Sequence, residues 1–156
     1  MDHYIKRKDG PNLNKFGFNE KVKEGMFYGI DYNDSIIATK NFRINTSPNL
    51  KLFLHNTALL YKLLDYAQNK DLKVIICTMP LYRTYLDERN PDILRRRDSI
   101  LKLLPIKYKN VKVFERENDT MHFITSDYIN HNHLNPVGAE KFSKDLNEII
   151  QNGFKD

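Results

Sequence analysis

A short apolar run in the middle of the chain constrains the fold more than any other feature. Residues 73–79 read Lys-Val-Ile-Ile-Cys-Thr-Met, and Pro80 follows directly. An unbroken apolar run of this length, closed by a proline, is typical of a strand that is buried on both faces of a parallel sheet. Residues 111–115, Val-Lys-Val-Phe-Glu, predict a second strand. Two such strands point to an α/β fold, because parallel strands need a crossover connection, usually a helix, between them.

Predicted helices alternate with the two strands. The first is expected to open with Ser47 as its N-cap and to run to about Asn69. The second is capped by Asn90 and is expected to end at Pro105, and the third is capped by Asn135. This alternation predicts an α/β fold in which a parallel sheet has right-handed crossovers and flanking helices.

The N-terminal third of the chain is expected to be an irregular arm, residues 1–46, and residues 47–156 are expected to form the packed domain. The first 46 residues are polar and show no sustained period of apolar side chains. Within them, residues 35–39, Ser-Ile-Ile-Ala-Thr, are the one stretch able to pair as a short strand. The packed part is therefore predicted to begin at Ser47.

The composition is that of one small folded domain. The chain has 156 residues, of which 40% are hydrophobic, and this suffices to bury a core. It contains neither an apolar run long enough to span a membrane nor a signal peptide, so the chain as given is expected to be soluble and its cellular location stays open. The single cysteine, Cys77, excludes an internal disulfide framework and is interpreted as an inert core thiol.

The basic charge does not point to a nucleic-acid partner. The net charge of +5 comes partly from the run Arg95-Arg96-Arg97. Asp92 and Asp98 lie close to this run on the same predicted helix, which favours a solvated helix face over a nucleic-acid surface. The interleaving of aromatic and basic residues that is typical of single-strand binders is also missing. We therefore expect no nucleic-acid partner.

A histidine directly before the last predicted helix is the strongest functional signal. Asn135 is a good N-cap, Pro136 suits the first helical position, and Gly153 is a plausible terminator. His133 lies two residues before the cap, on a loop that the helix holds in place, and such loops often carry catalytic imidazoles. The pair His131 and His133 could also begin a metal site, but the spacing alone is weak. We expect neither a metal nor a cofactor.

The residues His133-Leu-Asn-x-x-Gly-Ala139, followed by Phe142-Ser143, resemble the last conserved block of the SGNH (GDSL-like) hydrolase family, particularly its bacterial envelope-polysaccharide branch. In that family the histidine is the general base for a serine nucleophile, and an aspartate three residues earlier orients the imidazole. The resemblance therefore implies His133 as the base and places Asn130 at the orienting position. An asparagine can hold a tautomer by accepting a hydrogen bond, but it cannot stabilise an imidazolium by charge. Asp127 is the nearest carboxylate and is the alternative orienter.

The resemblance extends upstream to about Leu50. Thr78 to Tyr85 look like the family's strand followed by a proline loop. The likeness implies a flavodoxin-like, three-layer sheet. It also implies that His133 and the loop after Met79 lie on the same edge of that sheet, because both would follow strands at their carboxyl ends.

The block that carries the nucleophile in this family, Gly-Asp-Ser or Gly-Ser-Ser, does not occur in the chain. Among the serines only Ser35 has a context that could expose a hydroxyl, and its neighbours look like a turn. We therefore expect the chain to be the C-terminal part of a longer protein, with a sheet that is incomplete on its N-terminal side. The strand of Val74 to Ile76 would then lack a neighbour. We expect the arm or a second copy of the chain to cover it, and we favour a homodimer.

Two functions follow from these observations. In the first, the chain derives from an SGNH-type serine esterase or O-acyltransferase that acts on acyl groups of envelope polysaccharide. An acylated carbohydrate is then the expected partner, and the parent protein could be envelope-associated. In the second, a non-catalytic domain keeps the scaffold and binds carbohydrate or a partner chain through Tyr82, Tyr85 and Tyr128. These tyrosines are predicted near the carboxyl ends of the strands, where open α/β sheets place ligands.

Overall fold

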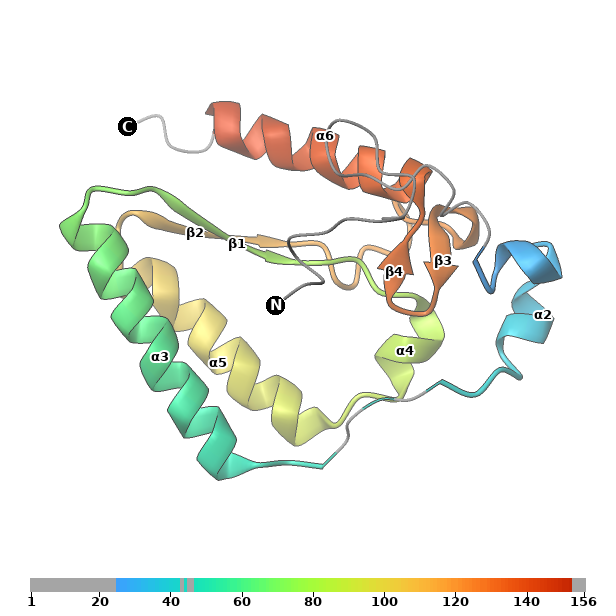
Figure 1. Cartoon of the computed structure of the whole chain (residues 1–156), viewed down its shortest axis with the longest axis horizontal. Coiled ribbons are helices and arrows are strands. Elements are labelled where there is room, and N and C mark those ends of the chain that lie inside the picture. The colour runs from blue at the N-terminus through green and yellow to red at the C-terminus, as the bar shows by residue number, and fades with distance from the viewer. Residues whose placement is uncertain (1–24, 43, 45–46, 153–156) are drawn as a thin grey trace, which may run out of the picture.

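The computed structural model describes residues 25–42, 44 and 47–152 of the chain. They form a mixed α/β structure in which a small parallel sheet lies between helices (Figure 1). The sheet consists of β1 (Val74–Thr78) and β2 (Val111–Glu115). The long helices are α3 (Leu50–Asn69), α5 (Pro91–Lys107) and α6 (Pro136–Asn152). The shorter elements are α2 (Asp34–Ile37), α4 (Arg83–Asp87), β3 (Tyr128–Asn130), β4 (His133–Leu134) and two 3₁₀ turns, Tyr28–Ile30 and Thr125–Asp127.

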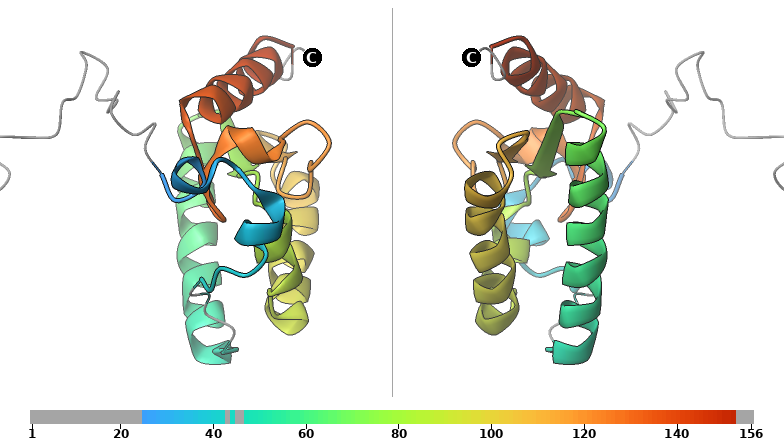
Figure 2. Two further views of the ribbon diagram at one scale, coloured as in Figure 1. Left: turned by 90° about the vertical axis from the view of Figure 1, so that its right-hand side faces the viewer. Right: turned by 90° about the vertical axis from the view of Figure 1, so that its left-hand side faces the viewer.

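Helices cover both faces of the sheet. α6 lies over one face, and α3 and α5 lie side by side over the other (Figure 2). Side chains of β1 alternate between the two sides: Val74 and Ile76 pack into the cluster formed with α3 and α5. Ile75 and Cys77 pack against the cluster that contains Phe142 of α6. This burial on both sides explains why the run has no polar alternation.

The two strands lie where the sequence predicts them. They are parallel, with Val74 opposite Val111 and Thr78 opposite Glu115. β2 has the predicted bounds, and β1 is one residue shorter at each end than the predicted 73–79. Within the described residues these two strands make up the whole parallel sheet, so a complete flavodoxin-like sheet is not shown.

α3 begins later than predicted because a different residue caps it. The side-chain Oδ1 of Asn49 accepts a hydrogen bond from the Leu52 N–H at 2.9 Å, so Ser47 is not the N-cap. Asparagine and serine cap helices about equally well, and the sequence alone did not distinguish the two positions. The helix ends at Asn69, as predicted.

α5 begins as predicted and ends later. The Oδ1 of Asn90 accepts hydrogen bonds from two backbone N–H groups of the first turn, at 2.9 and 3.2 Å. The predicted end at Pro105 is wrong, because the helix continues to Lys107. A proline this close to the helix end removes one backbone hydrogen bond only. Leu104 and Tyr108 are buried against the sheet and hold the last turn in place.

Packing begins within segment 1–46, and not at Ser47 as expected. Phe27 and Ile37 are fully buried and belong to the same core cluster as the inner side of α6. The Phe27 N–H also donates to the Ile129 carbonyl at 3.0 Å, which ties the segment to β3. Burial of these two large apolar side chains thus packs residues 25–42 against the core, although the segment is polar in overall composition.

Residues 35–39 do not form a strand, because most of them belong to α2 and the turn that follows it. The Oδ1 of Asn33 accepts hydrogen bonds from two backbone N–H groups, each at 3.1 Å, and this cap outweighs the β propensity of the two isoleucines. Asp34 then accepts from the Tyr82 hydroxyl at 2.6 Å and from the Thr125 hydroxyl at 2.8 Å. These hydrogen bonds hold the pKa of Asp34 below its ordinary value.

One face of the structure stays open. The outer side of α3 exposes Leu59, Leu63 and Tyr66, each by half or more. Next to this helix, β1 has β2 as its one strand neighbour in the described part of the chain. Coverage of the β1 edge by a second copy of the chain stays a prediction. The other expected cover is the arm of residues 1–46, of which residues 1–24, 43, 45 and 46 lie outside the described residues.

In the part of the chain that the structure describes, no helix has both the length and the apolar character of a membrane span. Cys77 is half-buried in β1, and burial raises the pKa of its thiol. The thiol is therefore held in its protonated, less reactive form. Gly153, the expected terminator of α6, lies outside the described residues.

The start of α6 is fixed by Asn135, as predicted. Its Oδ1 accepts hydrogen bonds from the N–H groups of Val137 and Gly138, both at 3.0 Å. Its Nδ2 donates to the Ser126 carbonyl at 2.6 Å, and its backbone N–H donates to the Asp127 carbonyl at 2.8 Å. One side chain therefore caps the helix and fastens it to the preceding turn.

We predict that Gly138→Ala destabilises the protein, because a Cβ at this position would collide with the Asp127 carbonyl oxygen and lie 3.0 Å from the Asp127 Cβ. The helix propensity of alanine would favour the variant by about 1 kcal/mol, whereas overpacking costs about 1–3 kcal/mol. Because the contact is with a backbone oxygen, which cannot move aside as a side chain can, the upper end of this range applies, and urea unfolding should show a net loss of up to about 2 kcal/mol. Gly29→Ala is the matched control, since nothing lies within 4 Å of its Cβ position. Equal stability of the two variants would contradict the close contact.

Candidate functional site

The β3–β4 hairpin carries the predicted histidine and lies at the carboxyl ends of β1 and β2 (Figure 1). The loop that follows β1 contacts it directly, because the Tyr82 N–H donates to the His131 carbonyl at 3.0 Å. The same loop contacts the chain after β2, where the Leu81 N–H donates to the Glu117 carbonyl at 3.2 Å. The hairpin and the loop after Met79 therefore lie at the same end of the sheet, as predicted.

His133 and Asn130 are brought together. The Nδ1 of His133 lies 3.0 Å from the Oδ1 of Asn130, and the same oxygen accepts from the Asn132 N–H at 3.1 Å. Because this oxygen can only accept, the hydrogen bond requires the proton on Nδ1 and leaves the lone pair on Nε2. A general base needs such a lone pair where a substrate can reach it, and His133 is exposed.

Asp127 is held elsewhere. Its carboxylate is 2% exposed, accepts from the Lys141 ammonium at 2.7 Å and from the Ile124 N–H at 2.9 Å. Its backbone carbonyl receives the Asn135 N–H. The structure thus brings together two of the three predicted site residues, His133 and Asn130, and uses Asp127 to fix the turn before α6.

In the described part of the chain no serine hydroxyl is hydrogen-bonded to His133, whose ring pairs with Asn130. Ser99 and Ser143 donate to helix carbonyls of Arg96 and Ala139, at 2.7 and 2.8 Å. Ser35 is exposed on α2. None of these three serines is therefore hydrogen-bonded to His133.

The three tyrosines of the alternative function do not share one cavity: Tyr82 and Tyr128 line a cavity of about 230 Å³, whereas Tyr85 lines another. Tyr82 and Tyr128 are 4% and 1% exposed and belong to the core. Burial, followed by the charge of Asp127, raises the pKa of Tyr128 far above its ordinary value. Tyr85 is half-buried and stacks on Phe42, with the ring centroids 5.3 Å apart. Aromatic residues near strand ends can pack into a core as well as contact a ligand. Here Tyr82 and Tyr128 pack into the core.

His131 has a different environment from His133. Its ring is 2% exposed, stacks on Phe42 at 4.2 Å and meets the edge of Phe27 at 5.1 Å. Its Nε2 has no hydrogen-bond partner among the described residues. One histidine is buried and the other exposed, so the pair does not converge on one point. In the described part of the chain no group of three His, Cys, Asp or Glu side chains is placed to hold a metal.

A buried ion cluster, which the sequence did not predict, lies directly after β2. Glu117 is 8% exposed and receives both Arg97 Nη1 and Arg97 Nη2, at 2.6 and 2.7 Å. Arg89 Nη1 lies 2.6 Å from the same carboxylate. Burial alone would raise the pKa of Glu117, but the hydrogen bonds from Arg97 and Arg89 outweigh it and hold the pKa below its ordinary value. The available signal was a glutamate two residues beyond a predicted strand.

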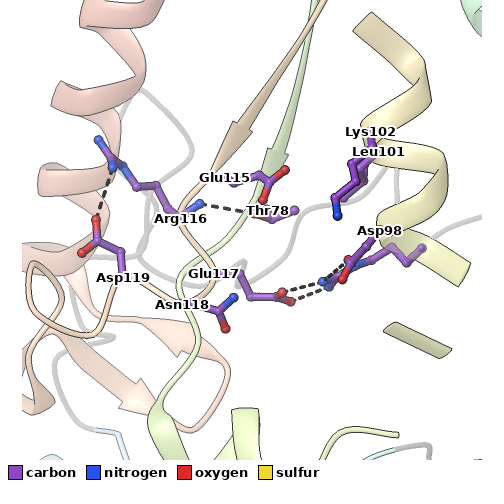
Figure 3. A pocket seen from close by; sticks show the side chains of 10 residues that line it. Thr78, Asp98, Leu101, Lys102, Glu115, Arg116, Glu117, Asn118 and Asp119 are labelled. Carbon is purple, nitrogen blue, oxygen red and sulfur yellow. Dashed lines mark hydrogen bonds and ion pairs between the residues drawn. The ribbon is translucent and has the colours of Figure 1, made fainter. Parts of the chain in front are cut away.

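Beside this cluster lies a cavity of about 510 Å³ at the carboxyl ends of the two parallel strands (Figure 3). Thr78 and Glu115, the last residues of β1 and β2, form one side of it. Leu101 and Lys102 of α5 form the other side. The cavity occupies the position where open α/β sheets bind ligands.

No family model, no curated protein and no solved structure matches this chain.

We predict that His131 makes the protein less stable in acid. Burial lowers the pKa of His131, while a backbone hydrogen bond with Ile37 acts in the opposite direction. Below about pH 6.5 the unfolded chain binds a proton that the native ring resists, so stability is complete above this pH and falls below it, by at most about 1.4 kcal/mol per pH unit. Urea unfolding across this range should show the loss in the native protein and a smaller loss in His131→Phe. The exposed-site control His133→Phe should keep the full loss. Identical pH profiles for both variants would contradict the assignment.

Proposed function

We propose that this chain is the C-terminal part of an SGNH-type serine esterase or O-acyltransferase that acts on acyl groups of envelope polysaccharide. In this proposal His133 is the general base, and the two-stranded sheet is the end of a flavodoxin-like, three-layer sheet. The serine nucleophile comes from polypeptide outside the chain. The observation that carries the proposal is the hydrogen bond between Asn130 Oδ1 and His133 Nδ1 at 3.0 Å.

The chemistry follows from the tautomer. With its proton on Nδ1, His133 can accept the proton of a serine hydroxyl at Nε2 while the serine oxygen attacks the ester carbonyl. The imidazolium then returns this proton to the sugar oxygen as the ester bond breaks. Asn130 orients the ring throughout, but it offers no negative charge to the imidazolium. We therefore expect a slower base than the family's aspartate would give.

The alternative function is a non-catalytic domain that binds carbohydrate on the same scaffold. The placement of the serines favours it, because Ser99 and Ser143 are engaged with helix carbonyls and Ser35 lies on α2. The cavity at the strand ends would then be the functional site, and His133 would be a surface residue. The two functions differ in whether His133 is needed for activity.

The chain alone is predicted to be almost inert as an esterase. An imidazole without a nucleophile supplies general-base assistance of roughly a hundredfold to ten-thousandfold, far less than an acyl-enzyme mechanism. The purified chain should therefore hydrolyse p-nitrophenyl acetate only slowly and without saturation. Rapid, saturable hydrolysis that Ser35→Ala abolishes would place the nucleophile at Ser35 instead.

The role of His133 is tested in the product of the gene's whole reading frame, with acetylated polysaccharide as substrate. His133→Gln should lower kcat/KM roughly a thousandfold or more, because the proton acceptor is lost. Asn130→Asp should raise the rate, because a carboxylate stabilises the imidazolium. His55→Gln, at an exposed position on α3, is the matched control and should be unaffected. A reading frame without a Gly-Asp-Ser or Gly-Ser-Ser block, or full activity in His133→Gln, would reject the proposal.

A further inference from the structure

The cavity at the strand ends is lined by charges of both signs, most of which already have partners. Arg97 is engaged by Glu117 at 2.6 and 2.7 Å and by Asp98 at 2.8 Å. Arg116 is engaged by Asp119 at 3.2 Å, and also by Asp145 of α6 at 3.2 Å. The charges of Arg97 and Arg116 are therefore balanced by neighbouring carboxylates, so these side chains are not free to pair with a ligand.

Two charged side chains of the cavity have no such partner. Lys102 of α5 and Glu115 at the end of β2 form no hydrogen bond or ion pair in the described part of the chain. Figure 3 shows them on opposite sides of the cavity, with the Glu115 carboxylate and the Lys102 ammonium both turned toward the space between. Thr78 lies between them, and its Oγ1 accepts from the Arg116 N–H at 3.3 Å, which leaves its hydroxyl proton free to donate.

We propose that this cavity binds an uncharged, hydroxyl-rich ligand, a sugar residue, between Glu115 and Lys102. A sugar hydroxyl both donates and accepts, so one hydroxyl can donate to the Glu115 carboxylate while its neighbour accepts from the Lys102 ammonium. The Thr78 hydroxyl adds a donor on the strand side. The proposal deepens the proposed function, and it rests on the carbohydrate part of it.

The balance of one free lysine and one free glutamate disfavours a ligand with a net charge. An anion that paired with Lys102 would also face the unpaired Glu115, and a cation that paired with Glu115 would face the unpaired Lys102. Like charges repel each other, although solvent weakens this repulsion because both side chains are exposed. A sugar hydroxyl meets both free groups without this repulsion. The cavity volume of about 510 Å³ lies in the range of small-ligand sites.

The test is binding to the full chain, followed by backbone-amide NMR shifts, with soluble tetrasaccharides as probes. Maltotetraose, xylotetraose and mannotetraose are the uncharged probes, and oligogalacturonate and a glucosamine oligomer are the charged ones. At least one uncharged probe should give saturable shifts that centre on Thr78, Lys102 and Glu115. Lys102→Met and Glu115→Gln should each weaken this binding roughly tenfold, the effect of losing one charge-assisted hydrogen bond. The matched controls Lys62→Met on α3 and Glu148→Gln on α6, both at exposed positions, should leave it unchanged.

The outcomes separate this proposal from the esterase proposal. Saturable binding of an uncharged sugar that depends on Lys102 and Glu115 supports the site, whether or not His133 is needed for ester hydrolysis. Three results would overturn it: no saturable shift with any uncharged probe, tighter binding of a charged oligomer, or equal weakening in the control variants. Loss of activity in His133→Gln together with any of these results would reject the sugar site and leave the esterase proposal standing.

Discussion

The structure depends most on the contacts of Asn135. This side chain caps α6 through two backbone N–H groups and donates to the Ser126 carbonyl, while its backbone N–H holds the Asp127 carbonyl. These four hydrogen bonds join the last helix to the turn before β3, and Gly138 allows the close approach because a Cβ there would meet the Asp127 carbonyl oxygen. The β3–β4 hairpin lies between these two anchored points. The hydrogen bonds of Asn135 therefore fix the position of the hairpin, and the contact between Asn130 and His133 depends on that position.

The fold could be predicted from the sequence where a pattern has one physical explanation. An apolar run without alternation requires a strand with both faces covered, and β1 and β2 occur where such runs predict them. Asn90 and Asn135 each precede a proline, and each caps a helix. The prediction was wrong where two local preferences compete: capping by Asn33 made a helix of the stretch after it, and burial of Leu104 carried α5 past Pro105.

The site was predictable only in part, because tertiary contacts decide what a polar residue does. The spacing of Asn130 and His133 places them on neighbouring positions of a hairpin, and their contact follows. Nothing local distinguishes Asp127, which is buried with Lys141, from a carboxylate that orients a histidine. The ion cluster of Glu117 joins residues of α5 and of the chain after β2, about twenty positions apart, and such pairs leave no periodic signal.

The central claim is that Asn130 holds His133 in the tautomer of a general base. Long-range ¹H–¹⁵N NMR of the imidazole nitrogens measures it directly at neutral pH. In the native chain the neutral ring of His133 should carry its proton on Nδ1, and Asn130→Ala should shift the population toward the Nε2–H tautomer that free histidine prefers. A native ring protonated mainly on Nε2, with the same spectrum in Asn130→Ala, would contradict it.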